Sequence, residues 1–446
     1  MNTELLLAVL AGIALLLVLI LFVRIHAFLA LLIMSVTVGL LAGMNGTEIA
    51  ETIQKGMAST LGFVATVVGL GAMFGSILEA SGGAEAIAKS LISPSQTQRA
   101  PWTMMITGYI VSIPVFFDVG FIILIPLIYG LQRRSGKSIL AFAIPLLAGL
   151  AVTHAFVPPT PGPVAVAGIL GSDLGTVILV GLLAGFPAAI VGGILWGKFI
   201  SRRIFAAAPE IKEEESESNV PPLWMFLMLI IIPLALIVTN TIIERLIKSG
   251  IHNIELLNKI FGLIGHPFAA LIIANLLAWY LLGIRRGMSR EKLLEITTRS
   301  LTPVGMIILL IGAGGVFKQV LVDTGSGEML ARSMSSLGIP AFLFAFITAA
   351  IIRMLQGSAT VAMITSAGLT APLITSIGLS EVQLACIVIS IASGATFMSH
   401  VNDSGFWLVK QYLGLTEKQT FRSWTVMTMI VGVTGLVGAG VIYYLL

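Results

Sequence analysis

Charged residues and cysteine are both scarce in this chain. Only 10% of its 446 residues are Asp, Glu, Lys or Arg, whereas soluble domains carry roughly 25%. Together with 57% hydrophobic residues and a mean hydropathy of +1.03, this excludes a soluble globular protein and predicts an integral membrane protein in a lipid bilayer. The single cysteine, Cys386, excludes a disulfide framework and a thiolate cluster.

Several chemical motifs are also missing. The sequence holds no GxxxxGK[ST] loop, no HExxH, no clustered His, Cys and Asp set and no basic stripe. These absences argue against ATP-driven transport, a metal cofactor and a nucleic-acid partner. An intramembrane hydrolase using Ser399 and His400 is disfavoured, because sequential neighbours on a broken helix rarely face each other productively. We therefore expect no enzyme.

Long apolar segments make up most of the chain. A membrane helix needs about 20 apolar residues. The segments fall at about 5–23, 27–43, 57–78, 101–128, 138–170, 174–197, 223–243, 267–284, 301–321, 340–375, 382–409 and 423–446. Segment 5–23 has no small-residue cleavage site after it and predicts a retained helix. Segments 101–128 and 340–375 are too long for one span and carry Pro, Gly and charged residues inside, so each predicts a re-entrant helical hairpin.

The distribution of basic residues favours this topology. With both hairpins re-entrant, eighteen of the 25 Lys and Arg residues fall on one side of the membrane and five on the other. Basic loops face the cytoplasm, so both termini are expected outside. Full two-span crossings would largely cancel this bias.

An internal repeat points the same way. Residues 69–90 and 312–333 align without gaps, with identical residues such as Gly69 and Gly312 or Phe74 and Phe317. Glycine coincidences are common in membrane helices, so the alignment gains its weight from agreement with the charge bias. We predict an all-α integral membrane protein of two inverted repeats, each with a re-entrant helical hairpin and a broken transmembrane helix. The first repeat is 1–205, an acidic cytoplasmic linker is 206–222 and the second repeat is 223–446, with about five spans and one hairpin in each repeat.

Two polar or proline-rich runs interrupt apolar segments in corresponding parts of the halves. They are Pro158-Pro159-Thr160-Pro161-Gly162-Pro163 and Ser399–Trp407. Polar backbone is tolerated in hydrocarbon only where it is buried in protein or lines a wet cavity. Paired breaks of this kind point to the binding site of a secondary transporter. Proline stops a helix, so the first run is expected to be non-helical near 158–163.

Ionisable and hydroxyl groups inside the hairpins are the first site candidates. Asp118, in the first hairpin, is a proton-coupling candidate or a structural carboxyl at the tip. Gly357, Ser358 and Thr360 form a small, hydroxyl-rich tip in the second hairpin, suited to an anion or a polyol, although a tight helix contact is the alternative. Arg353 is expected to pair with a substrate carboxylate or to neutralise a protein carboxylate.

The breaks supply the remaining candidates. Asn402 and Ser404 offer amide and hydroxyl groups for substrate binding, and Asp403 is a second proton-coupling candidate with a structural role as the alternative. His154 flanks the first break as His400 does the second, and we include His154 in the binding site.

At these residues the chain resembles the gluconate permease (gluconate:proton symporter) family of the ion transporter superfamily, nearly end to end. The matching motifs are Gly71–Gly75, Phe117–Phe121, His154–Pro163, Gly314–Asp323, Gly357–Ala362 and Ser399–Trp407. Each motif alone is weak, and together they are specific.

The resemblance implies proton-coupled uptake of gluconate or a related sugar-acid anion across the bacterial inner membrane, by a homodimer with elevator-type movement of a domain bearing both hairpins. The only cofactor implied is the proton as coupling ion, and sodium stays open. Thr160 stands where family members commonly have His, and Asp118 where they often have Glu, so Thr160 joins the candidates as a residue that shifts substrate choice. Other acids that relatives carry, such as glycerate, fructuronate or D-serine, remain alternatives, as does a passive channel or facilitator.

Overall fold

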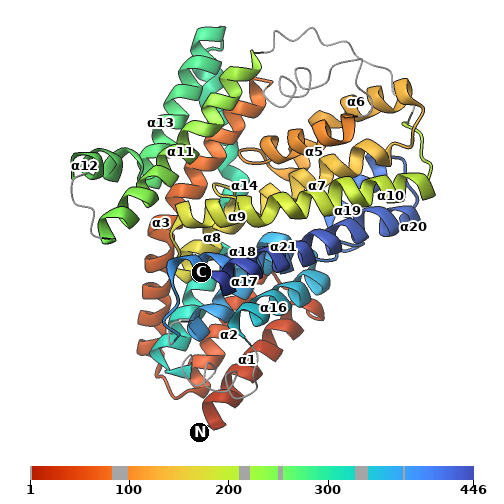
Figure 1. Ribbon diagram of the computed structural model, residues 1–446. Coiled ribbons are helices and arrows are strands. Elements are labelled where there is room, and N and C mark those ends of the chain that lie inside the picture. The colour runs from red at the N-terminus through yellow and green to blue at the C-terminus, as the bar shows by residue number, and fades with distance from the viewer. Residues whose placement is uncertain (1–2, 83–98, 210–220, 250–254, 327–339, 375–376) are drawn as a thin grey trace.

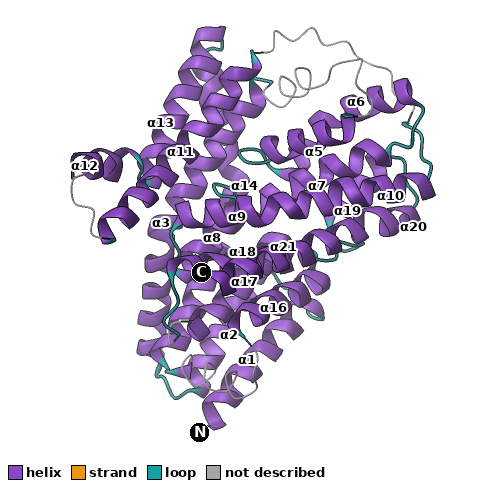
Figure 2. Ribbon diagram, viewed as in Figure 1, coloured by secondary structure: helices purple, strands orange, loops and turns teal. Residues whose placement is uncertain are grey.

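The computed structural model describes residues 3–82, 99–209, 221–249, 255–326, 340–374 and 377–446. Every regular element in these ranges is a helix (Figure 2). Seven helical segments are long and apolar enough to cross a membrane. They are Gly46–Ala80, Leu140–Leu170, Leu174–Arg203, Trp224–Lys248, Pro267–Arg286, Arg290–Asp323 and Glu417–Leu445. The prediction of an all-helical, multi-pass membrane protein is thus confirmed.

The order of elements is closely similar in the two halves of the chain. The first half contains α1 (Thr3–Leu21), α2 (Ala27–Leu41), α3 (Gly46–Ala80), α5 (Ala100–Val111), α6 (Phe117–Ser135), α7 (Leu140–Phe156), α8 (Pro161–Leu170), α9 (Leu174–Ala189), the π-helical η1 (Ile190–Leu195) and α10 (Trp196–Arg203). The second half contains α11 (Leu223–Lys248), α12 (Glu255–Ile264), α13 (Pro267–Ala278), η2 (Trp279–Gly283), η3 (Ile284–Arg286), α14 (Arg290–Asp323), α16 (Ala341–Gln356), α17 (Ala359–Ile374), α18 (Glu381–Thr396), α19 (Ser404–Tyr412), α20 (Glu417–Thr420), η4 (Phe421–Thr425) and α21 (Val426–Leu445). Each half therefore has a long helix, then a helical hairpin, then a broken helix.

The helices form two groups that run in different directions (Figure 1). Helices α3, α11 and α13 stand roughly upright in this view, whereas α7, α9 and α10 run across it at a large angle. The second group also holds α16 and α21, which lie below α9 in the same view. Both helical hairpins and both broken helices belong to the second group.

The long helices α3 and α14 cross in close contact at small residues. A Cβ atom added to Gly315 would lie 2.2 Å from the Thr60 hydroxyl oxygen and 2.8 Å from the Gly56 carbonyl oxygen. The reverse holds at Gly56, where a Cβ would lie 2.6 Å from the Val316 Cα. Small residues let membrane helices approach until their backbones touch, because van der Waals packing replaces the hydrophobic drive that is absent in lipid.

Both predicted hairpins are pairs of helices joined by a short turn. Residues 112–116 join α5 to α6, and Gly357 with Ser358 joins α16 to α17. The second hairpin has the predicted extent of 340–375 within the part of the chain that is described. The first runs further than the predicted 101–128, because α6 continues to Ser135 before Gly136 ends it in the left-handed conformation at φ 64°.

Both predicted breaks are present, but each is shifted toward the N-terminus. Residues 157–160 separate α7 from α8, and Pro161 and Pro163 lie in the first turn of α8, where a proline costs little because its missing N–H has no helical partner. Residues 397–403 separate α18 from α19, so Ser404 to Trp407 are helical. The predicted non-helical stretch near 158–163 is therefore present at 157–160, and its last three residues belong to α8.

Two predicted features lie partly outside the described residues, and two observed features were not predicted. The linker 206–222 is described only at its ends, and the aligned repeats 69–90 and 312–333 only up to Gly82 and Ser326. Helix α12 was not predicted, because its ten residues are too few for a span. The N-terminus of α3 lies eleven residues before the apolar segment 57–78, where Asn45 and Glu48 form a capping box.

We predict that Gly315→Val separates α3 from α14 and lowers the melting temperature of the detergent-solubilised protein. The added atoms meet backbone at Gly56, which cannot rotate away, and overpacking of this kind costs about 1–3 kcal/mol. Gly305→Val is the matched control on the same helix, since no atom lies within 4 Å of a Cβ added there. Equal melting temperatures of the two variants would contradict the close backbone contact between α3 and α14 at Gly315.

Candidate substrate site

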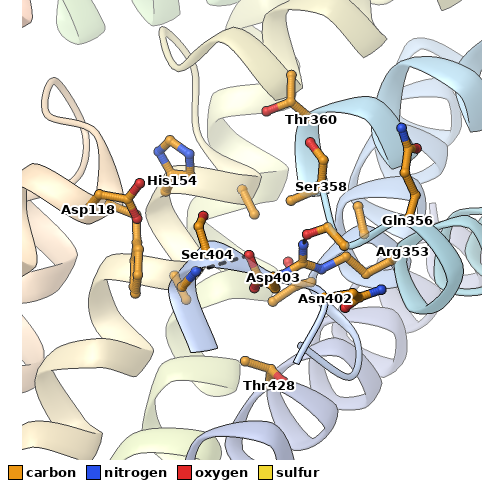
Figure 3. Close-up of a pocket in the computed structure, with 18 of the residues that line it drawn as sticks. Asp118, His154, Arg353, Gln356, Ser358, Thr360, Asn402, Asp403, Ser404 and Thr428 are labelled. Atoms are coloured by element: carbon orange, nitrogen blue, oxygen red, sulfur yellow. Dashed lines mark hydrogen bonds and ion pairs between the residues drawn. The ribbon is translucent and has the colours of Figure 1, made fainter. Parts of the chain in front are cut away.

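A cavity of about 410 Å³ lies where both hairpins meet the second broken helix and the C-terminal end of α7. This volume falls within the range of small-molecule sites, roughly 300–1,000 Å³. Its walls come from the start of α6, the end of α7, the tip between α16 and α17, the end of α18, the second break and the start of α21. In Figure 3, Asp118 and His154 lie on one side, the tip with Ser358 and Thr360 on the other, and Ser404 between them.

The structure brings most of the predicted site residues to this cavity. Those that line it are Asp118, His154, Arg353, Gly357, Ser358, Thr360, Asn402, Asp403 and Ser404. Thr160 does not line it. Its buried hydroxyl donates a hydrogen bond to the Val157 carbonyl oxygen at 2.7 Å, and the residue lies against α3 near Gly71.

A buried ion pair joins the second hairpin to the second break. The Arg353 guanidinium donates to the Asp403 carboxylate and also to the Gly357 carbonyl oxygen. Both side chains are almost completely buried, with exposed fractions of 7% and 11%. Of the two alternatives drawn from the sequence for Arg353, the geometry therefore favours neutralisation of a protein carboxylate.

Asp403 is satisfied by further donors. Its carboxylate accepts the Ser399 hydroxyl and, as the N-cap of α19, the Gly405 N–H at 3.1 Å. Ser399 is itself held by the Trp424 indole N–H at 2.7 Å. A guanidinium and two neutral donors thus surround the Asp403 carboxylate, which are the contacts of a positioning residue.

The second break is also fixed to the end of α16. Both His400 Nε2 and Asn402 Nδ2 lie 2.8 Å from the Met354 carbonyl oxygen. A Cβ added to Gly357 would lie only 2.1 Å from the Asn402 carbonyl oxygen, and Gly357 has φ 86°. Glycine is the residue that fits both the left-handed turn and this close approach. The tip and the break thus form one rigid wall.

Asp118 lies on the opposite wall without such partners. Within the described part of the chain, its carboxyl has no hydrogen bond or ion pair, and the residue is exposed toward the cavity (Figure 3). The neighbouring His154 has a buried Nδ1 atom with no hydrogen-bond partner among the described residues. This wall therefore keeps polar groups available for a ligand or a proton.

The N-terminal ends of three helices border the cavity. Phe117 and Asp118 start α6, Ala359 and Thr360 start α17, and Ser404 with Gly405 starts α19. The first N–H groups of a helix have no partner within the helix and carry partial positive charge. Such ends favour an anionic group of a ligand.

Sequence reasoning missed several residues of the cavity. Gln356, Trp424 and Thr428 line it, together with Phe117 and Thr396. Trp424 and Thr428 are four residues apart and lie on one face of the η4–α21 helix, a spacing that the sequence displays but that apolar patterns do not distinguish from packing. Among the residues that the structure describes, no group of three His, Cys, Asp or Glu side chains could hold a metal ion.

Comparison with known proteins identifies the family. The model of the GntP family permeases matches residues 4–445. The chain belongs to this family. It is 41% identical to the low-affinity gluconate transporter of Escherichia coli K12 over 99% of both chains, and 40% identical to a gluconate permease of Pseudomonas aeruginosa over 93% of this chain and 92% of that one. It is 37% identical to the Gnt-II system L-idonate transporter of E. coli over 96% of both.

Solved structures of distant transporters share the fold. The YdaH transporter of Alcanivorax borkumensis aligns with a TM-score of 0.65 at 16% identity over 98% of both chains. MtrF of Neisseria gonorrhoeae aligns with a TM-score of 0.63 at 14% identity over 93% of both. This GntP-family permease is a multi-pass membrane transporter and not an enzyme, as predicted.

We predict that Arg353 and Asp403 are energetically coupled, so that removing both destabilises the protein less than the sum of removing each one. Breaking a buried pair leaves one charge unpaired and costs about 3–5 kcal/mol. Arg353→Met and Asp403→Asn should each lower the melting temperature strongly, whereas the double variant should be less destabilised than the sum of the two. Asp323→Asn, which breaks the more exposed pair with Lys55, is the control and should have a small effect. Additive losses in the double variant would contradict a direct coupling.

Proposed function

We propose that this permease carries gluconate or a closely related sugar acid into the cell across the bacterial inner membrane, coupled to protons. The named substrates of the relatives support this substrate class, since gluconate transporters from two genera are about 40% identical over nearly the whole chain. L-Idonate is the second candidate, on the similarity to the L-idonate transporter.

The proposal of proton coupling rests on the charges that line the cavity. Arg353 and Asp403 cancel each other, which leaves the Asp118 carboxylate as a negative group without a partner within the described residues. Two like charges about 4 Å apart repel by roughly 4 kcal/mol at an effective dielectric constant of about 20, or about a thousandfold in affinity. A sugar-acid anion therefore binds well only when a proton on Asp118 removes that charge, which couples the two.

Hydroxyl and amide groups suit the rest of the substrate. Ser358 and Thr360 at the hairpin tip face the cavity, together with Asn402 from the second break and Ser404 at the start of α19. We assign the substrate hydroxyls to these side chains and its carboxylate to the N-terminal ends of α6, α17 and α19. His154, with its buried Nδ1 unsatisfied among the described residues, is assigned a further hydrogen bond to the substrate. Thr160, away from the cavity, is assigned an indirect role through the shape of the first break.

The transport cycle that we propose follows from the arrangement of the helices. The hairpins α5–α6 and α16–α17 are taken as re-entrant and the two halves as inverted repeats, on the charge bias and the shared order of elements. The group of helices that bears both hairpins is then the moving domain of an elevator-type carrier. We include a homodimer in the proposal, since the resemblance to the family implies one.

The experiment that tests this function is uptake of labelled gluconate into proteoliposomes with and without an inward proton gradient. A symporter accumulates gluconate above equilibrium and loses this ability with a protonophore. Uptake that stops at equilibrium and ignores the gradient would mean a facilitator. Accumulation driven by a sodium gradient alone would assign the coupling to sodium. If L-idonate is taken up and gluconate is not, the assigned substrate changes to L-idonate and the proposed mechanism stands.

We predict that Asp118→Asn separates substrate exchange from proton coupling. The amide cannot ionise, so it neither repels the anion nor carries a proton. Accumulation driven by the proton gradient should be lost, while exchange of labelled for unlabelled gluconate across the membrane should persist. Glu381→Gln is the control, because this exposed carboxyl at the start of α18 lies away from the cavity. Proton-driven accumulation by Asp118→Asn would remove Asp118 from the coupling role.

A further inference from the structure

A second cavity, of about 450 Å³, adjoins the tip of the second hairpin. Its walls come from the junction of α1 and α2, the middle of α14 and the tip itself. Gln356, Ser358 and Thr360 line both this cavity and the substrate cavity, so the tip is a wall common to the two. We call the second cavity the vestibule.

The vestibule is lined by basic and neutral groups. Arg24 and His26 line it, and none of its lining residues is Asp or Glu. Arg24 is exposed and has no ion-pair partner in the described part of the chain. A guanidinium without a carboxylate beside a cavity attracts small anions and raises their local concentration.

The backbone at Arg24 adds an independent observation. Its φ is 59°, in the left-handed region that favours glycine, and only one other non-glycine residue in the described ranges has a positive φ. Strain of this kind is often kept at functional sites, where the side chain is needed. Glycine at this position would relieve the strain and lose the charge.

The hydrogen bond made by His26 leaves its Nε2 atom as the donor of the neutral ring. His26 caps α2, and its Nδ1 accepts the Phe28 N–H at 3.3 Å. Because Nδ1 acts as acceptor, the proton of the neutral ring lies on Nε2, which can donate to a ligand. Gln356, with a buried Oε1 lacking a partner among the described residues, adds a further polar group on the shared wall.

We propose that the vestibule is a second binding site for the transported anion, in which Arg24 and His26 hold its carboxylate while the tip residues contact its hydroxyls. This rests on the proposed function. The charge bias assigns Arg24 to the cytoplasmic side, so the vestibule receives the anion as it leaves the substrate cavity past the tip. The same groups would also bind the phosphate of a lipid, and the experiment separates these two occupants.

The experiment measures modification of a single reporter cysteine in proteoliposomes. Met306→Cys places the thiol on the vestibule wall formed by α14, and the native Cys386 is fully buried and stays in place. The rates of an anionic and a cationic methanethiosulfonate reagent are compared, each normalised to its rate with a free thiol. We expect the anionic reagent to be favoured about tenfold in vesicles of neutral lipid.

Variants of Arg24 decide the assignment. The preference should disappear in Arg24→Gln, remain in Arg24→Lys, and remain in Arg134→Gln, which removes an equal charge from an exposed position at the end of α6. Gluconate should slow the anionic reagent in neutral vesicles. An unchanged preference in Arg24→Gln would overturn the proposal. Slowing by anionic lipid but not by gluconate or L-idonate would overturn it in favour of a lipid site.

A second reporter separates this proposal from the proposed function. Ala359→Cys lies in the substrate cavity and not in the vestibule. Protection of this cysteine by gluconate, with no protection of Met306→Cys, would keep the transported substrate and reject the vestibule site. If neither cysteine is protected by gluconate or L-idonate, the substrate assignment fails, and the reagent preference with its loss in Arg24→Gln still decides whether the vestibule binds anions.

Discussion

The buried ion pair between Arg353 and Asp403 is the interaction on which the shape of the substrate cavity depends. It connects the end of α16 to the start of α19, residues 50 positions apart in the chain. Since a buried charge without its partner costs several kcal/mol, the hairpin tip and the second break cannot separate without a large penalty. The Met354 carbonyl contacts and the close approach at Gly357 act in the same direction, so these segments move as one body or not at all.

Because that pair is internally neutral, the charge of the cavity is decided on the opposite wall. Asp118 has no ion-pair partner within the described residues, because Arg353 on the opposite wall is paired with Asp403. In the proposed function, an anionic substrate adds a second negative charge. The protein could have placed an arginine there to bind the anion tightly, but tight binding in every state would hinder release. In the proposed mechanism, substrate affinity depends on protonation of the Asp118 carboxyl, which is the condition that a symporter needs.

The sequence predicted the membrane class, both hairpins and both breaks, because hydrophobic length and proline position are local signals. It also selected nine of the cavity residues, since polar groups inside apolar segments are rare enough to be noticed. It could not decide between the two roles of Arg353, because that required knowing that Asp403 lies beside it. Trp424 and Thr428 were not predicted for a similar reason. Aromatic and hydroxyl side chains are common in membrane helices, and only the fold shows that these two line a cavity. The first break ends earlier than predicted because Pro161 and Pro163 fit the first turn of α8, where proline is tolerated. In a run of several prolines, the sequence does not show which of them begins a helix.

The two halves share an order of elements but contribute different numbers of polar groups to the substrate cavity. The second break and the first residue of α19 supply the Asp403 carboxylate, the Asn402 amide and the Ser404 hydroxyl to the cavity. In the first break, the Thr160 hydroxyl donates to the backbone instead, and the break packs against α3. The end of α8, which follows the first break, is instead bound to α14, whose Lys318 ammonium donates to the Ile169 carbonyl oxygen. A cation at the C-terminal end of a helix is favoured by the helix dipole, and this bond is directional without being an ion pair. In the proposed cycle the second half thus supplies most of the groups that contact the substrate, joined by Asp118 and His154 from the first half. The first break lies against the helices along which the loaded domain has to move.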